Sequence, residues 1–243
     1  MKKNILPYIW KHSRLVYNCP KNVDKNSLIM NAEEYIFFEN KIDFAYVAIY
    51  NDHVVISFKG TDNIKGWISN IDPYPLKSDE YNNKYLKDGR WGRGSIHDGF
   101  YTSWKFFKSC INKVIEAYHI NPKELNIITC GHSRGGALAE LCARHLAKNL
   151  GMECSCITFG APAVGTKRYR DQFRMLTING TRVVNGWDLV PDLPPSSFGF
   201  KHGCANKVWM KKALWKRCIP WIRINDNYQN SYELAVNKRF LKK

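Results

Sequence analysis

The sequence predicts an α/β fold in which crossover helices cover a largely parallel central sheet. Three observations predict it. Apolar runs rich in β-branched residues alternate with stretches of helical spacing between residues 53 and 185. The run at 127–130 passes through a Gly-rich turn directly into a helical stretch at 137–148. No linker divides the 243 residues, so we expect a single domain over 1–243.

The first strands are predicted to form a hairpin. Residues 44–50 and 53–58 are apolar and β-branched, and Asn51-Asp52 between them is typical of a tight turn. Residues 1–40, by contrast, look like helix and loop. The second strand ends in Gly60-Thr61, where a backbone N–H and a side-chain O–H can point into a site.

A short amphipathic helix is predicted at 63–71, because its apolar residues have helical spacing. Such a helix is either a lid that meets lipid when open or ordinary core packing. A longer helix is predicted at 100–119 from an apolar stripe that Asn121-Pro122 ends. Further strands are predicted at 155–160 and 182–185.

The turn Gly131-His132-Ser133-Arg134-Gly135 joins the strand at 127–130 to the following helix. In this context a Gly-x-Ser-x-Gly turn is typical of a nucleophile elbow, which exposes the serine oxygen above a parallel sheet. Gly131 and Gly135 leave room for the cramped turn, and Gly136 lets the helix approach closely. The alternative is an ordinary turn serine. We interpret Ser133 as the nucleophile.

A serine nucleophile needs a base and a carboxylate that orients the base. Asp188 follows the strand ending at Asn185, which places it at the same sheet edge as Ser133, and a proline-rich loop follows it. The alternative role for this aspartate is a local cap. Position along the predicted elements argues against five of the histidines as the base: His12, His53, His119, His132 and His145. His97 and His202 are left as candidates.

Six motifs, in order along the chain, resemble those of the class 3 lipases, the fungal lipase-like α/β-hydrolases. They span about residues 44–205 and are Phe58-Lys59-Gly60-Thr61, Trp67-Ile68-Ser69-Asn70, His97-Asp98-Gly99-Phe100, Gly131 to Ala139, Phe159 to Gly165, and Asn185 to Pro195. The resemblance implies an α/β-hydrolase fold with a lid helix at 63–71. It further implies hydrolysis of carboxylic esters of acylglycerols or related lipids, without a metal or organic cofactor.

The resemblance also implies residue roles. Ser133 is the nucleophile and Asp188 the triad acid, and the oxyanion hole is formed by Thr61 with the backbone N–H of Arg134. The family's base is a histidine a few residues before a tyrosine, and the matching stretch here runs from Asp226 to Tyr232 with Asn227 in the histidine's place. Asparagine cannot accept a proton at physiological pH.

Two readings of function follow from this departure. In the first, the chain is a serine ester hydrolase in which His202, or else His97, replaces the base. In the second, it is a catalytically impaired lipid-binding or membrane-binding protein, because Asn227 stands where the base should be. The intact elbow favours the first reading.

The net charge of +16 is concentrated at the two ends of the chain. Residues 201–243 hold eleven Lys or Arg against two acidic residues, and residues 1–30 hold six against one. Such ends suit an anionic membrane surface or another polyanion, or are simply solvated. No recognition motif supports specific nucleic-acid binding.

Hydropathy and cysteine content predict the compartment and whether a metal is bound. The sequence has no apolar run of 18 residues and a poor signal-peptide start. Eight cysteines without an export signal suit a reducing compartment, so we expect a cytoplasmic protein, peripheral to membranes at most. Cys154 and Cys156 lack a second close pair with metal spacing, so no zinc site is expected.

Overall fold

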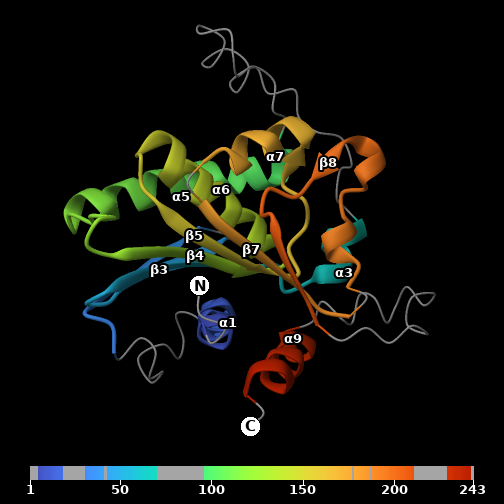
Figure 1. The fold of residues 1–243 in the computed structure, drawn as a ribbon, viewed down its shortest axis with the longest axis horizontal. Coiled ribbons are helices and arrows are strands. Elements are labelled where there is room, and N and C mark those ends of the chain that lie inside the picture. The colour runs from blue at the N-terminus through green and yellow to red at the C-terminus, as the bar shows by residue number, and fades with distance from the viewer. Residues whose placement is uncertain are drawn as a thin grey trace, which may run out of the picture.

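The computed structural model describes residues 5–18, 31–40, 43–69, 96–176, 178–186, 188–210 and 229–241. These ranges contain a seven-stranded sheet in the order β1-β2-β3-β4-β5-β7-β9 and a small sheet of β6 and β8 (Figure 1). The strands are β1 (Glu34–Glu39), β2 (Phe44–Ile49), β3 (His53–Phe58), β4 (Asn126–His132), β5 (Cys154–Phe159), β6 (Gly165–Thr166), β7 (Ile178–Val184), β8 (Phe200–Lys201) and β9 (Asn206–Trp209).

The central sheet is parallel from β3 to β9, and β1 and β2 add an antiparallel edge. This confirms the predicted mostly parallel sheet. The predicted hairpin is also confirmed, since β2 and β3 pair around a turn closed by a 2.8 Å hydrogen bond from Tyr50 N–H to the carbonyl of His53. The assignment of residues 1–40 to helix and loop was wrong at β1, whose half-exposed side chains give no clear alternation of apolar and polar residues.

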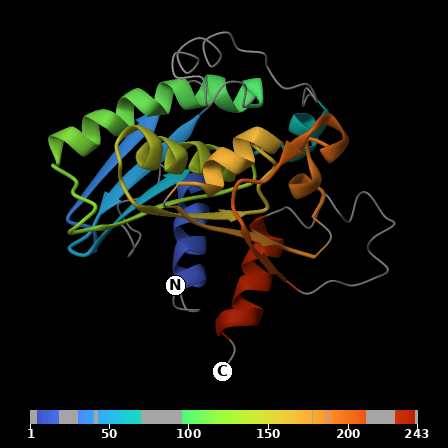
Figure 2. The same ribbon diagram turned by 45° about the horizontal axis from the view of Figure 1, so that its top comes forward.

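Helices cover both faces of the sheet (Figures 1 and 2). They are α1 (Ile5–Leu15), α3 (Ile64–Ser69), α5 (Asp98–Ala117), α6 (Arg134–Asn149), α7 (Lys167–Arg174) and α9 (Gln229–Val236), with short helical turns η1 (Val16–Asn18), η3 (Val190–Asp192), η4 (Ser196–Phe198) and η6 (Asn237–Leu241). In both views α5 and α6 lie on one face, and α1 and α9 lie on the other. The chain thus forms three layers.

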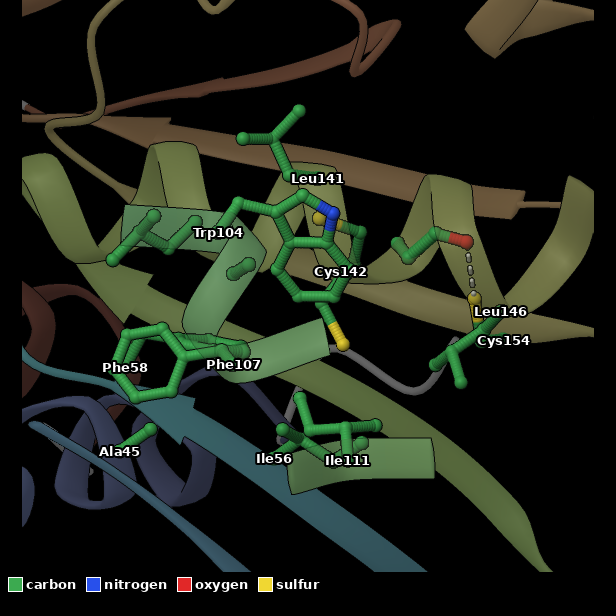
Figure 3. Packing of buried hydrophobic residues seen from close by; sticks show 14 of the residues in the cluster. Ala45, Ile56, Phe58, Trp104, Phe107, Ile111, Leu141, Cys142, Leu146 and Cys154 are labelled. Carbon is green, nitrogen blue, oxygen red and sulfur yellow. Dashed lines mark hydrogen bonds between the residues drawn. The ribbon is translucent and has the colours of Figure 1, made fainter. Parts of the chain in front are cut away.

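The larger apolar core lies between the sheet and α5 and α6 (Figure 3). Phe58 of β3 packs edge-on against Phe107 of α5, with ring centroids 5.3 Å apart, and Leu141 of α6 belongs to the same cluster. The apolar stripe predicted for the helix at 100–119 is buried at Trp104, Phe107, Ile111 and Val114, whereas Ile115 is partly buried and Tyr118 is exposed. A fully buried large side chain of this kind contributes about 1.5–3 kcal/mol.

The second core lies between the sheet and the helices α1 and α9. Trp10 of α1 stacks on Tyr232 of α9 with ring centroids 5.6 Å apart, and its indole N–H donates to the carboxylate of Glu233. The C-terminal helix is therefore fixed to the sheet through α1.

The predicted helix at 63–71 is present as α3, in which Ile64 is buried. Residues 70 and 71 lie outside the described residues, and the role of this helix as a lid stays a prediction. Within the described ranges, no helix is long and apolar enough to cross a membrane, and no group of three or more His, Cys, Asp or Glu could hold a metal ion. The six cysteines in those ranges are free thiols.

Candidate active site

Thr61, Ser133 and Asp188 follow the carboxyl ends of the parallel strands β3, β4 and β7, and β5 lies between β4 and β7 in the sheet. Phe58 of β3 is in register with Gly131 of β4, His132 of β4 with Phe159 of β5, and Phe159 with Val183 of β7. The loops that follow these strands therefore begin at one edge of the sheet. Thr61, Ser133 and Asp188 lie in or at the start of these loops, as the sequence predicted.

Ser133 adopts a strained backbone at the junction of β4 and α6. Its φ of 54° and ψ of −129° lie in a region that residues with a side chain rarely adopt, at a cost of about 1–3 kcal/mol. The conformation is held by a 2.8 Å hydrogen bond from Ser133 N–H to the carbonyl of Phe159 and a 2.9 Å bond from Gly136 N–H to the carbonyl of Ser133. Strain of this kind clusters at functional sites.

The glycines around Ser133 are required by close backbone contacts. A side chain on Gly131 would collide with the carbonyl group of Gly135, and one on Gly135 would collide with the carbonyl oxygen of Phe58 in β3. A side chain on Gly136 would meet Ala161 after β5. The predicted reason for these glycines is confirmed, because the elbow turn is pressed against both neighbouring strands.

The hydroxyl of Ser133 is buried, which differs from the exposed serine oxygen predicted for an elbow, and none of the described residues forms a hydrogen bond with its Oγ. A buried hydroxyl without a partner costs free energy, so it is uncommon in a purely structural serine. The strained backbone and the buried hydroxyl without a described partner make Ser133 the candidate reactive group of this edge.

Asp188 is 3 % exposed and is held by two hydrogen bonds. Its Oδ1 accepts the N–H of Val190 at 2.9 Å, and its Oδ2 accepts the hydroxyl of Tyr232 at 2.7 Å. The same hydroxyl accepts the N–H of Asn185 at 3.0 Å. Tyr232 is thus a positioning residue that joins α9 to the loop after β7. The sequence placed it in the base segment but gave it no role, since nothing local shows contact across 44 residues.

The loop after β3 is packed against the elbow. A side chain on Gly60 would collide with the carbonyl of His132, and the hydroxyl of Tyr17 lies 2.9 Å from Nδ1 of His132. This packing brings the start of the Thr61 loop next to the residue before Ser133, as an oxyanion hole requires.

Arg134 is the first residue of α6, so its backbone N–H has no acceptor within the helix. Its guanidinium points elsewhere. Nη2 pairs with Asp43 Oδ1 at 2.5 Å and also hydrogen-bonds Ser103 Oγ. The side chain therefore braces the elbow, and the backbone N–H is the group that can face an oxyanion.

The structure does not bring His202 to Ser133. Its Nε2 is 2.7 Å from the carbonyl oxygen of Pro191, and burial together with the positive charge of Arg182 lowers its pKa to about 3. His97 is also buried, at the start of α5, where its ring packs on Phe100. Because Ser133 Oγ has no partner among the described residues, neither imidazole is bonded to it here. Asn227 lies outside the described residues.

Comparison with known proteins decides the family. Residues 55–198 match the family model described as lipase (class 3), which is more than half of the chain. The chain belongs to the class 3 lipase family. The resemblance seen in its six motifs is thereby confirmed.

Individual class 3 lipases match the chain as well. The secreted mono- and diacylglycerol lipase 1 of Fusarium solani is 32 % identical over 187 residues, which cover 76 % of this chain and 52 % of that protein. A lipase of Rhizomucor miehei is 30 % identical over 162 residues, covering 65 % of this chain and 41 % of that lipase. The chain spans about half the length of these curated relatives.

Solved structures of class 3 lipases share the fold. The Rhizomucor miehei lipase in its propeptide complex has a TM-score of 0.68 at 23 % identity, over 86 % of this chain and 69 % of that one. A second structure is that of a triacylglycerol lipase whose catalytic centre is formed by a serine protease triad. It has a TM-score of 0.66, also at 23 % identity, over 86 % of this chain and 80 % of that one. The α/β-hydrolase fold is confirmed.

The expectation of a cytoplasmic protein was wrong. Relatives from Fusarium solani and Malassezia globosa are named secreted mono- and diacylglycerol lipases. The cysteine count misled because a thiol buried in an apolar core is a packing residue in any compartment. Five of the six described thiols are buried in this way: Cys130, Cys142, Cys154, Cys156 and Cys204.

Proposed function

We propose that this class 3 lipase is a serine hydrolase that cleaves carboxylic esters of acylglycerols or related lipids. The observation that carries the proposal is Ser133, whose strained backbone presents a buried hydroxyl without a partner among the described residues. Asp188, buried at the same sheet edge, supports the assignment.

The chemistry assigns each group a role. Ser133 Oγ attacks the ester carbonyl while its proton passes to a base, and the oxyanion is stabilised by Thr61 and the N–H of Arg134. The alcohol leaves with a proton, and water then releases the acyl group from Ser133. Asp188, held by Val190 and Tyr232, orients the base and stabilises its charged form.

Two histidines are candidates for the base. His202 stays a candidate, although in this structure its Nε2 is engaged by Pro191 and its neutral form is strongly favoured. His97 is the second candidate for the base. A base must reach the serine hydroxyl directly or through one water, so either imidazole would have to move.

The relatives support the choice of substrate and compartment. Two are named for mono- and diacylglycerol lipase activity and secretion, and we extend both properties to this chain as proposals. A diacylglycerol emulsion is therefore the first substrate to test, with the full chain and its Ser133→Ala variant side by side. Fatty-acid release by the parent and none above background by the variant is the expected result. Equal release by both would refute the assignment of Ser133.

A second candidate function is favoured by one specific observation. His202 is hydrogen-bonded to Pro191, away from Ser133, and the family's base position holds Asn227. We propose as the alternative that the chain binds lipid or an anionic membrane surface without hydrolysing an ester. Binding of diacylglycerol emulsion by a parent that releases no fatty acid would establish this alternative.

A further inference from the structure

A basic cavity lies beside the loop that follows Asp188. Its volume is about 480 Å³, within the usual range for small-molecule sites. One wall is the loop at 191–196, and the others are formed by α7, β7 and the segment from β8 to β9. Figures 1 and 2 show α7 and β8 side by side next to the C-terminal end of the sheet. None of the predicted catalytic residues except His202 lines it.

The charges around the basic cavity are unbalanced. Five cationic side chains line it, and Asp192 is the one acidic residue among the described lining residues. The cations are Arg170, Arg174, Arg182, Lys201 and Lys207. Because like charges repel more strongly where water is displaced, gathering them here costs free energy that a bound anion would recover.

Two of these cations stand directly opposite each other on adjacent strands. Arg182 of β7 is in register with Lys207 of β9, and both side chains line the cavity. Two like charges at neighbouring positions of a sheet repel each other. The ammonium of Lys207 lies 3.4 Å from the ring centroid of Trp209, which offsets part of this cost, and a bound anion would offset the rest.

Arg182 provides a second, independent observation. Its Nε is buried and has no hydrogen-bond partner within the described ranges. Burial lowers the pKa of this guanidinium, whereas nearby Cys204 and Glu140 raise it in part. An unpaired, buried N–H donor on a side chain that lines the basic cavity costs free energy.

Two of the other cations that line the cavity have partners within the chain. Arg174 donates from its Nε to the carbonyl of Gly203 at 3.2 Å, which directs one edge of its guanidinium to the backbone. Arg170 pairs with the exposed Asp171 at 2.5 Å, at the rim. Fork-shaped guanidinium groups suit the paired oxygens of a phosphate group.

We propose that the basic cavity is a binding site for a phosphate group, separate from the ester-cleaving site. Phosphate fits better than a simple carboxylate because the cavity offers donors from several directions, as three acceptor oxygens require. The volume leaves room for an organic group attached to the phosphate. This phosphate belongs either to a lipid headgroup or to a soluble phosphate ester.

The test is binding, measured on the full chain by calorimetry and by vesicle co-sedimentation. The probes are inorganic phosphate, glycerol 3-phosphate, and phosphatidylcholine vesicles with and without phosphatidic acid. Arg174→Gln and Lys201→Gln are each expected to weaken binding about tenfold, as for a lost charge-assisted hydrogen bond. Arg182→Gln is expected to weaken binding more. Arg182 is half-buried, and if its variant does not fold, the variant of the exposed Arg174 decides the test.

The matched control is Arg168→Gln, which removes the same charge from an exposed position of α7 that does not line the cavity. It is expected to change binding less than about twofold, by the screening of exposed charges. Binding of the soluble probes assigns a soluble phosphate ester, and binding only to phosphatidic acid vesicles assigns a lipid headgroup. The proposal is overturned if no probe binds, or if Arg168→Gln weakens binding as much as Arg174→Gln.

Discussion

The hydroxyl of Tyr232 donates a 2.7 Å hydrogen bond to Oδ2 of Asp188, across 44 residues of sequence. Both groups are buried, and the same hydroxyl accepts the N–H of Asn185. Through these hydrogen bonds the helix α9 fixes the start of the loop that follows β7. The orientation of the proposed triad acid depends on a helix on the opposite face of the sheet from α6.

Tyr232→Phe is expected to lower the free energy of unfolding by about 2 kcal/mol, because a charge-assisted hydrogen bond is lost and the Asn185 N–H is left unpaired. Ester hydrolysis is expected to fall at the same time, since Asp188 is less well oriented. Urea denaturation and initial rates measure the two effects. Tyr118→Phe is the control, because Tyr118 is exposed at the end of α5. Equal stability of the two variants would contradict the role given to Tyr232.

Gly135→Ala is expected to prevent formation of the native elbow, because the new methyl group would collide with the carbonyl oxygen of Phe58 in the neighbouring strand. The loss should exceed about 3 kcal/mol, as for severe overpacking. Thermal denaturation gives the measurement.

The control for that substitution is Gly99→Ala. Gly99 lies in the first turn of α5, where a Cβ would meet only the ring of His97 at ordinary contact distance. Alanine there is expected to be neutral or stabilising by up to about 1 kcal/mol. If Gly135→Ala is as stable as Gly99→Ala, the turn is not as cramped as described.

Glu140 predicts a pH dependence of stability. It is buried in α6, where it accepts the N–H of Gly203 at 3.3 Å, and burial raises its pKa to about 7 from an ordinary 4.5. Between these two values the folded chain keeps a proton that the unfolded chain has released. This group's contribution to stability is therefore present below pH 4.5 and is lost as the pH rises to 7.

Glu140→Gln removes this titration. The difference in unfolding free energy between variant and parent is expected to shift toward the variant by on the order of 3 kcal/mol as the pH rises through that window. Using the difference cancels the histidines, which titrate in both chains. A flat difference curve for Glu140→Gln would show that the pKa of Glu140 is not raised.

Asn227→His restores a histidine at the family's base position. We expect the rate of ester hydrolysis to rise by on the order of 10² to 10⁴, the usual contribution of a positioned base. Hydrolysis of a p-nitrophenyl ester measures it, with Asn230→His as the control for a histidine placed nearby. Activity that appears only in Asn227→His would assign the native chain to the second candidate function. If the rate of hydrolysis does not rise, His202 remains the candidate base, and it is the residue to substitute next.

Much of the fold follows from local sequence patterns. The hairpin of β2 and β3, the stripe on α5 and the turn at Ser133 are each encoded within about 20 residues, so periodicity and glycine placement predicted them. The edge strand β1 was missed because half-exposed strands lack a regular alternation. The positions of Thr61, Ser133 and Asp188 could be predicted because each of them follows the end of a strand.

What could not be predicted depends on contacts distant in sequence. The hydrogen bond of Tyr232 to Asp188 and the pairing of Arg134 with Asp43 join segments that no local pattern connects. The position of His202 could not be predicted either, because a loop position specifies an edge of the sheet but not which carbonyl the imidazole meets. The compartment was predicted wrongly because burial of thiols and compartment are independent properties.

The most direct measurement is covalent labelling of the full chain by a fluorophosphonate probe, with the labelled peptide identified by mass spectrometry. A serine that is activated as a nucleophile is labelled, whereas an unactivated serine is not. We expect a label on Ser133 that is lost in Ser133→Ala and retained in Ser197→Ala, which changes an exposed serine. No label on the parent, or a label that persists in Ser133→Ala, would contradict this expectation.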